Sequence, residues 1–285
     1  MDEIKTPADL TKRPRFRESI DFSPSSGRKL ARILQSYRFP RRDYLPCGIS
    51  SCRTPHGSGY LVETSDGLET NIGNVCGAKH LGADFKQERS RFRAWERRHR
   101  NLQVIKGFQQ QAREHQERID QAVLRAKAFW HFTRQLDAPV RRALRAMAKE
   151  RQERLDSDDR LTREDSRALY QSLQVPQKFT HWYHEHRPTV ADLGLRFPGV
   201  SAMIYPFREV LVEELQKPMN DLLAMGMEEV EQLDDKRLDE WRQRIQAAPR
   251  RMREAENALK KAVALMAIDS SKFRFLPGVY PTEDD

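Results

Sequence analysis

The feature that most constrains this 285-residue chain is that its three cysteines all lie between positions 47 and 76. Cys47 and Cys52 flank a tight turn, in which Gly48 permits a knuckle conformation. Cys76 and His80 are one helical turn apart, so both side chains can point at one ion. An odd number of clustered cysteines is a poor disulfide framework and indicates a metal site in a reducing compartment. We therefore predict a closed tetrahedral site with Cys47, Cys52, Cys76 and His80 as its ligands.

A β-hairpin is predicted between the two ligand pairs. The stretch GYLVETSDGLETNIG contains an Asp-Gly pair flanked by β-forming residues, so we expect strands near 59–64 and 68–73. The order of knuckle, hairpin and helix with two ligands in its first turn resembles the treble-clef zinc finger over residues 44–100. This resemblance implies a structural Zn²⁺, which would supply folding energy that so small a segment cannot draw from its own core. His56 is a possible substitute for one of the four ligands.

A catalytic zinc would need an open ligand position and a nearby acid or base. Four protein ligands close the predicted site, and Glu63 and Glu69 in the hairpin have no evident partner for acid–base chemistry. Treble-clef nucleases place a histidine base in the hairpin, and this hairpin contains none. Common nucleotide-binding, serine-hydrolase and metalloprotease motifs are also missing from the sequence. We therefore expect a structural zinc in a non-enzymatic protein, with a metal-dependent nuclease as a minority alternative.

Two long segments, 83–174 and 207–268, carry apolar residues at alternating steps of three and four, which is the spacing of coiled coils. Residues 175–206 between them are rich in proline and aromatic residues and are predicted to form an irregular connector. Pro139 and Pro249 predict a break or a kink within the two segments. Two heptad segments joined by a connector favour an antiparallel helical hairpin, although helices of another copy or of another coiled-coil protein would fit equally well.

The remaining segments complete the predicted organisation. Residues 1–43 are expected to be a basic flexible arm with a short amphipathic helix at 27–39, residues 44–82 the zinc finger, and residues 269–285 a C-terminal tail. The predicted fold is mainly α, with a small treble-clef-like finger leading into an elongated antiparallel coiled-coil hairpin. Three tryptophans at heptad-like positions are predicted to be core residues: Trp95, Trp130 and Trp241.

The charge of the chain is positive but unevenly distributed. The formal net charge is +9, and ten basic residues stand against two acidic ones in segment 12–42. Segment 209–240 has eleven acidic residues against three basic ones, so acidic and basic parts of the molecule could dock on each other. The helix predicted after the finger lies between these segments, and several of its basic residues share one face. Together with a lysine that precedes this helix, they form the basic stripe: Lys79, Lys86, Arg89, Arg93, Arg97 and Arg100.

The basic stripe indicates contact with a polyanion, because neutralised phosphates add a salt-dependent term to affinity. The ordinary alternative is a solvated helix face, and Glu96, placed to pair with Arg100, favours that alternative slightly. Beside a zinc finger, we expect the stripe and the basic arm to bind DNA or RNA. The alternative function is that of an interaction scaffold or adaptor, in which the finger and the heptads bind protein partners.

Two further expectations concern location and a second histidine cluster. The amino terminus has no apolar run and no stretch of about 18 apolar residues occurs, so we expect a cytoplasmic protein that makes no membrane contact. His181, His184 and His186 lie close together in the connector and could form a second metal site. Since no carboxylate or cysteine accompanies them at a telling distance, we predict that they are packing residues instead.

Overall fold

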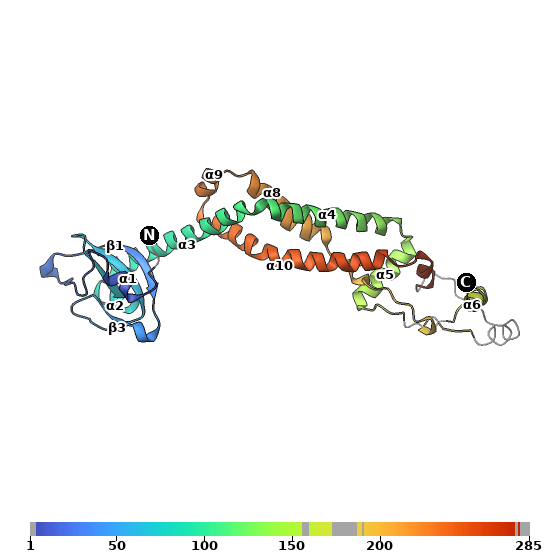
Figure 1. The fold of residues 1–285 in the computed structure, drawn as a ribbon, viewed down its shortest axis with the longest axis horizontal. Coiled ribbons are helices and arrows are strands. Elements are labelled where there is room, and N and C mark those ends of the chain that lie inside the picture. Colours follow the sequence, from blue (N-terminus) through green and yellow to red (C-terminus); the bar gives the residue numbers. More distant parts are fainter. Residues whose placement is uncertain (1–3, 156–159, 173–186, 190, 277–278, 280–285) are drawn as a thin grey trace. The chain divides into compact units, whose positions relative to one another are not determined.

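The structure is a computed structural model of the chain that describes residues 4–155, 160–172, 187–189, 191–276 and 279. It contains two compact units, Met1–Gln103 and Val104–Asp285. The fold is mainly helical, with a small antiparallel sheet (Figure 1). None of the helices in the described part of the chain is long and apolar enough to cross a membrane. The predicted histidine cluster at 181–186 lies outside the described residues.

The first unit is built around a three-stranded antiparallel sheet in the order β1-β4-β5. The predicted hairpin is confirmed, since β4 and β5 pair with Tyr60 opposite Ile72 and turn at Gly67, whose φ is +81°. A second, two-stranded sheet pairs β2 with β3. The elements are α1 (Pro7–Thr11), η1 (Pro24–Ser26), β1 (Leu30–Arg38), η2 (Arg41–Asp43), β2 (Leu45–Pro46), β3 (Pro55–His56), β4 (Ser58–Thr64), β5 (Glu69–Gly73), α2 (Asn74–His80) and the first part of α3 (Gly82–Gln110).

The predicted helix at 27–39 is wrong, because this segment forms strand β1 against β4. Two register shifts interrupt the pairing, one between Leu30 and Arg32 and one between Ile33 and Gln35. A bulge adds one residue to a strand and shifts the alternation of its two faces. The apolar side chains therefore recur at steps of three and four residues, which is the spacing that had suggested a helix.

The segment predicted to be a flexible arm is packed in its described part, from residue 4 to residue 43. Ile4, Leu10, Phe16 and Ile20 are all buried. The backbone around Phe16 runs parallel to Glu69 of β5 and forms a bridge with it. The isolated apolar residues of this segment therefore extend the core of the first unit.

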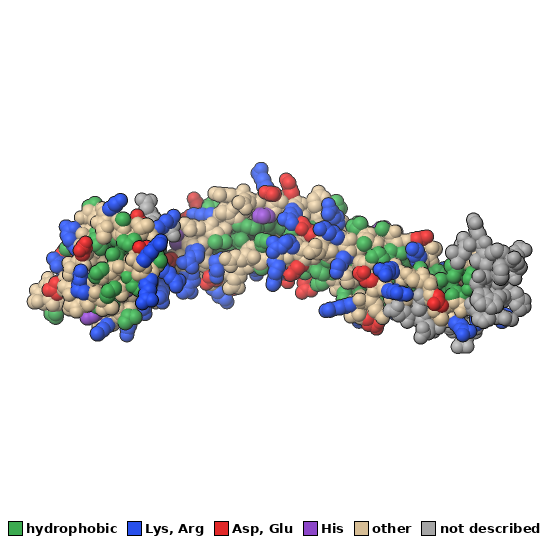
Figure 2. Space-filling view, turned by 60° about the horizontal axis from the view of Figure 1, so that its bottom comes forward, with side chains coloured by type: hydrophobic (Ala, Val, Ile, Leu, Met, Phe, Trp, Pro, Cys, Tyr) green, Lys and Arg blue, Asp and Glu red, His purple; other side chains and the backbone are tan. Residues whose placement is uncertain are grey.

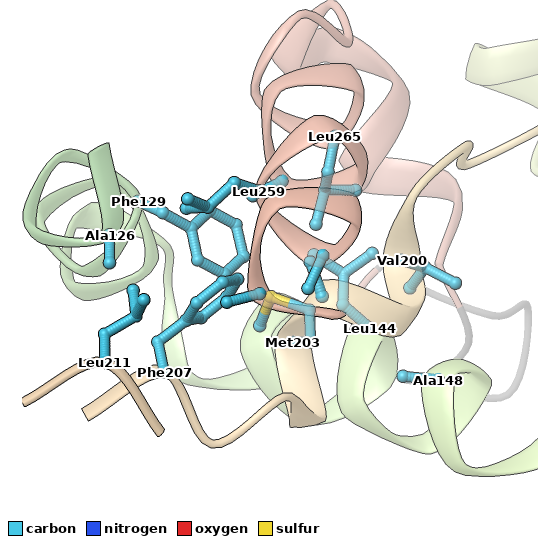
Figure 3. Packing of buried hydrophobic residues seen from close by; sticks show 14 of the residues in the cluster. Ala126, Phe129, Leu144, Ala148, Val200, Met203, Phe207, Leu211, Leu259 and Leu265 are labelled. Carbon is cyan, nitrogen blue, oxygen red and sulfur yellow. The ribbon is translucent and has the colours of Figure 1, made fainter. Parts of the chain in front are cut away.

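The second unit is a helical bundle with one hydrophobic core (Figure 3). Phe129 and Phe207 meet edge to face with ring centroids 5.9 Å apart, and Leu259 packs beside them. The elements are the last part of α3, α4 (Ala112–Gln135), α5 (Ala138–Glu150), α6 (Arg163–Ser172), η4 (Ala191–Leu193), η5 (Val200–Ile204), the π-helical η6 (Arg208–Gln216), α8 (Lys217–Ala224), α9 (Met227–Gln232), α10 (Asp235–Met266) and η7 (Ser270–Phe275).

The helices of the second unit are not arranged as the predicted two-segment hairpin. Gln109 donates to the Leu222 carbonyl, and Gln216 donates to Asp120. The later residue of α3–α4 thus contacts the earlier residue of η6–α8, so the two segments run antiparallel. Helix α10 also packs on α4 but runs in the same direction (Figure 1). Segment 207–268 turns back on itself around α9, which the heptad pattern alone does not reveal. Helix α5 and the short helix η5 also contribute residues to the core.

The prolines and tryptophans test the heptad assignment further. Pro139 lies in the first turn of α5, after a break from α4, as predicted. Helix α10 continues without a break through Pro249, and the kink expected there stays a prediction. Trp95 and Trp130 are 56% and 39% exposed, so their assignment to the core is wrong, and Trp241 is half-buried. On α4 the buried stripe includes Phe129, the residue next to Trp130, and a one-residue step turns a side chain by about 100° around a helix.

Candidate metal centre and basic surface

The three cysteines meet in the first unit. Cys47 follows β2, Cys52 lies in the turn before β3, and Cys76 lies in α2. Their sulfur atoms are all within 4.8 Å of one another. Cys47 and Cys76 are buried, while Cys52 is half-buried. This cysteine cluster can hold a metal ion, as the spacing in the sequence predicts.

The turn that carries Cys47 and Cys52 is fixed against the hairpin by close backbone approach. Gly48 donates its N–H to the Asn71 carbonyl at 2.7 Å. A Cβ atom added at Gly48 would lie only 1.8 Å from Thr70 Oγ1. Glycine is therefore required here for space, and its φ is not in the left-handed region. The N–H of Cys47 donates to the Thr54 carbonyl at 3.0 Å and closes the turn.

The surroundings of the sulfurs suit thiolate ligands. Cys47 Sγ accepts backbone N–H groups of Ile49 and Gly73, and Cys52 Sγ accepts the backbone N–H of Thr54. Hydrogen bonds to the charged form of a group favour that form, so these donors stabilise thiolates. For both cysteines of the turn, one donor is the N–H two residues further along the chain. The chemistry of the donor set therefore fits a bound thiophilic cation.

Burial and hydrogen bonding act differently on the three thiols. Burial raises the pKa of Cys47, and it raises that of Cys76, to about 12, together with a hydrogen bond to Cys52. Burial also acts to raise the pKa of Cys52, but hydrogen bonds with Thr54 outweigh it and lower the value to about 6. Without a cation, burial therefore keeps two of the thiols protonated. A metal ion would supply the positive charge that lets all three ionise.

Neither histidine proposed as a ligand belongs to the cysteine cluster. His80 is the last residue of α2 and its side chain is exposed. His56 is half-buried, with Nε2 2.7 Å from Tyr37 Oη and Nδ1 3.2 Å from the Thr54 carbonyl. Burial lowers the pKa of His56 and raises that of Tyr37. The Tyr37–His56 contact joins β1 to β3 beside the cluster, and no spacing in the sequence predicts it.

The two hairpin carboxylates considered for acid–base chemistry are both held in ion pairs. Arg32 contacts Glu63, and Arg13 contacts Glu69, each through Nε at 2.5 Å. Glu69 is buried and Glu63 half-buried. A guanidinium therefore pairs with each of the two hairpin carboxylates.

The basic stripe lies on the surface of the first unit. Arg89 is half-buried over the Phe85 ring at 5.9 Å, and Arg93 donates from Nε to Tyr60 Oη at 3.1 Å. Arg100 is 3.9 Å from Glu96, a weak surface pair. Within the part of the chain that the structure describes, none of the other stripe residues forms an ion pair with a carboxylate. Arg89 is the one half-buried residue of the stripe. The other five are exposed: Lys79, Lys86, Arg93, Arg97 and Arg100.

Almost all of the net charge resides in the first unit. Residues 1–103 contain 20 Lys and Arg against 12 Asp and Glu, a formal charge of +8, which leaves +1 for residues 104–285. Figure 2 shows Lys and Arg side chains spread over the first unit with fewer acidic side chains among them. Within the second unit, acidic residues of segment 209–240 form ion pairs with basic residues of the same unit. Examples are Lys106–Glu231 at 2.6 Å and Arg251–Glu214 at 2.8 Å.

The chain matches no protein-family model, no curated protein and no solved structure. No residue role can therefore be transferred from a relative.

Proposed function

We propose that this protein binds nucleic acid through the basic stripe, and that a Zn²⁺ ion in the cysteine cluster orders the unit that carries the stripe. The observation that carries the proposal is the segregation of charge, with +8 of the net +9 in residues 1–103. A surface of this kind attracts polyanions and raises their association rates. The exposed Lys79, Lys86 and Arg97 support it, because no carboxylate within the described residues neutralises them.

The stripe has a length suited to several phosphates. Lys86 and Arg100 are fourteen residues apart on one helix, which is roughly 21 Å at 1.5 Å per residue. Duplex DNA carries one charge per roughly 1.7 Å of axis, and Arg side chains bind phosphate with two parallel hydrogen bonds. The stripe can therefore neutralise several phosphates, and the affinity should depend strongly on salt.

Zinc is the metal we propose because three cysteine sulfurs, two of which accept backbone N–H groups, form a thiolate-rich set that a structural zinc prefers. His80 is the proposed fourth ligand, since it follows Cys76 by one turn within α2 and its exposed side chain is free to reorient. His56 is the weaker candidate, because its ring nitrogens already contact Tyr37 and Thr54. Bound metal would stabilise the junction of the turn, the hairpin and α2.

The test is fluorescence anisotropy of labelled DNA and RNA with the full-length, zinc-loaded protein. The stripe variant is Lys79/Lys86/Arg97→Glu. The control variant, Arg113/Arg142/Arg145→Glu, changes the net charge equally through exposed arginines of the second unit. We expect the stripe variant to lose at least about tenfold in affinity and the control to bind nearly as the wild type does. Equal losses in both variants, or no binding by the wild type at low salt, would contradict the proposal.

The interaction scaffold is favoured by a different observation in the second unit. An apolar groove is formed between α3–α4, η6–α8 and α10, and its lining includes Phe108, Leu215, Met219, Trp241 and Ile245. Methionine and aromatic side chains adapt well to protein partners. If the wild-type protein fails to bind nucleic acid, this groove is where a protein partner should be sought.

A further inference from the structure

Trp95 is the most exposed aromatic side chain of the described part of the first unit, at 56%. It stacks on the imidazole of His99, with ring centroids 5.3 Å apart and planes 12° from parallel. His99 Nε2 in turn contacts the side-chain amide of Gln103 at 3.1 Å. A large indole on the surface therefore has a defined position, which a side chain free in solvent would not have.

A row of aromatic rings connects this surface to the core. Buried Tyr60 meets Phe92 edge to face at 5.8 Å, and Phe92 contacts Trp95 at 5.7 Å. Because Phe92 is buried, the row is anchored below Trp95 and ends at exposed His99. The rings at the surface are thus packed on one another before a ligand binds, which lowers the entropy lost when a ligand stacks on them.

Two arginines lie on the same side of α3 as the aromatic surface. Arg91 and Arg98 lie four residues before and three residues after Trp95, so both are on its side of α3. Arg91 is exposed and forms an ion pair with Glu88 at 2.7 Å. At 100° per residue, Trp95 is on roughly the opposite side of α3 from the basic stripe. The aromatic surface is therefore separate from the stripe.

We propose that Trp95 and His99 form a stacking platform for an unpaired nucleobase, so that the preferred ligand is a single strand. This inference rests on the proposed function. Every nucleobase offers a π-face, and stacking on an aromatic side chain is tolerant of sequence. A paired base has both faces covered by its neighbours and cannot stack on Trp95. A flexible single strand can also reach both the platform and the stripe, whereas a straight duplex along the stripe cannot.

The experiment compares a labelled mixed-sequence oligonucleotide, as a single strand and as a duplex, by anisotropy with the full-length protein. The variants are Trp95→Ala, Trp95→Phe and, as a control, Trp130→Ala at an exposed tryptophan of the second unit. We expect Trp95→Ala to weaken single-strand binding by about tenfold, because one base stack is worth a factor of this order. Duplex binding should not change, and Trp95→Phe should retain most of the affinity.

Two further readouts separate stacking from other effects. The salt dependence of single-strand binding should be unchanged in Trp95→Ala, since stacking releases no counterions. Thermal unfolding shows whether this variant remains folded, and Trp95→Phe tests the platform with the aromatic packing on Phe92 retained. Unchanged single-strand affinity in Trp95→Ala, or an equal loss for the duplex, overturns the platform while leaving the stripe intact. Absence of all nucleic-acid binding by the wild type overturns both proposals.

Discussion

Arg13 donates two hydrogen bonds to the carboxylate of Glu69, from Nε to Oε2 at 2.5 Å and from Nη2 to Oε1 at 3.3 Å. The two residues are 56 positions apart, and their side chains are only 28% and 11% exposed. The bond therefore ties the N-terminal segment to β5, which leads directly into α2 and Cys76. Together with the buried apolar residues of this segment, the pair holds the segment against the sheet.

Loss of the Arg13–Glu69 pair should loosen the first unit. Arg13→Ala leaves a mostly buried carboxylate without its partner, and we expect the hairpin to lose about 2 kcal/mol of stability. Hydrogen exchange of the β4 and β5 amides in the full-length protein measures this. Arg28→Ala, which breaks the more exposed Arg28–Asp66 pair, should cost less than about 1 kcal/mol. Equal effects of the two variants would show that burial does not strengthen the first pair.

Two glycine substitutions should have opposite effects. Gly48→Ala would place Cβ against Thr70 Oγ1, and we expect a cost of about 1–3 kcal/mol from overpacking. A Cβ atom added at Gly107, inside α3, would meet no other atom within 4 Å. Gly107→Ala should therefore stabilise the helix by about 0.5–1 kcal/mol. Thermal unfolding of each full-length variant gives the sign. A stable Gly48→Ala protein with intact metal binding would refute the close approach described for the turn.

A left-handed residue at the end of α5 offers a stabilising change. Arg151 has φ +59° and follows the helix where glycine is usual, with Gln152 donating back to the Met147 carbonyl. Arg151→Gly should therefore stabilise the second unit by about 0.5–1 kcal/mol. Lys149→Gly, inside the last turn, should instead destabilise it by about 1 kcal/mol. Chemical denaturation monitored by circular dichroism distinguishes the two, and a lower midpoint for Arg151→Gly would contradict this account of the helix end.

Metal removal should affect the two units unequally. We expect one zinc per chain by elemental analysis, and chelation should unfold the first unit while the helices of the second remain protected from hydrogen exchange. Cys47→Ser should lower zinc affinity strongly, and His80→Ala should lower it more than the control His131→Ala, which removes another exposed histidine. Full zinc affinity in His80→Ala would exclude His80 as the fourth ligand without excluding the cysteine cluster.

Local signals in the sequence were sufficient for part of the first unit. The Asp-Gly turn with its flanking β-formers located the β4–β5 hairpin, and cysteine spacing brought Cys47, Cys52 and Cys76 together. The bulges of β1 give its apolar residues near-helical spacing, so the sequence pattern wrongly predicts a helix there. Short-range patterns thus succeed where one turn sets the geometry, and they fail where an irregular strand imitates another period.

Contacts between residues far apart in the sequence cannot be predicted from such short-range patterns. Nothing local to Arg13 indicates that its partner is Glu69, because the contact depends on how the N-terminal segment crosses the sheet. The heptads showed which helix faces are apolar but not the direction of the partners, so the return through η6–α8 was missed. Trp95 was assigned to the core by spacing alone, although α3 places it beside Phe92 at the surface.

The most direct test of the proposed function is the salt dependence of single-strand binding. Each phosphate contact contributes a slope of about −0.7 to a plot of log Kobs against log salt concentration for single strands. Replacing exposed Lys86 and Arg97 by Gln should therefore reduce the slope by about 1.4, and Arg142/Arg145→Gln in the second unit should leave it unchanged. The same slope for both variants and the wild type would contradict the basic stripe as the nucleic-acid contact.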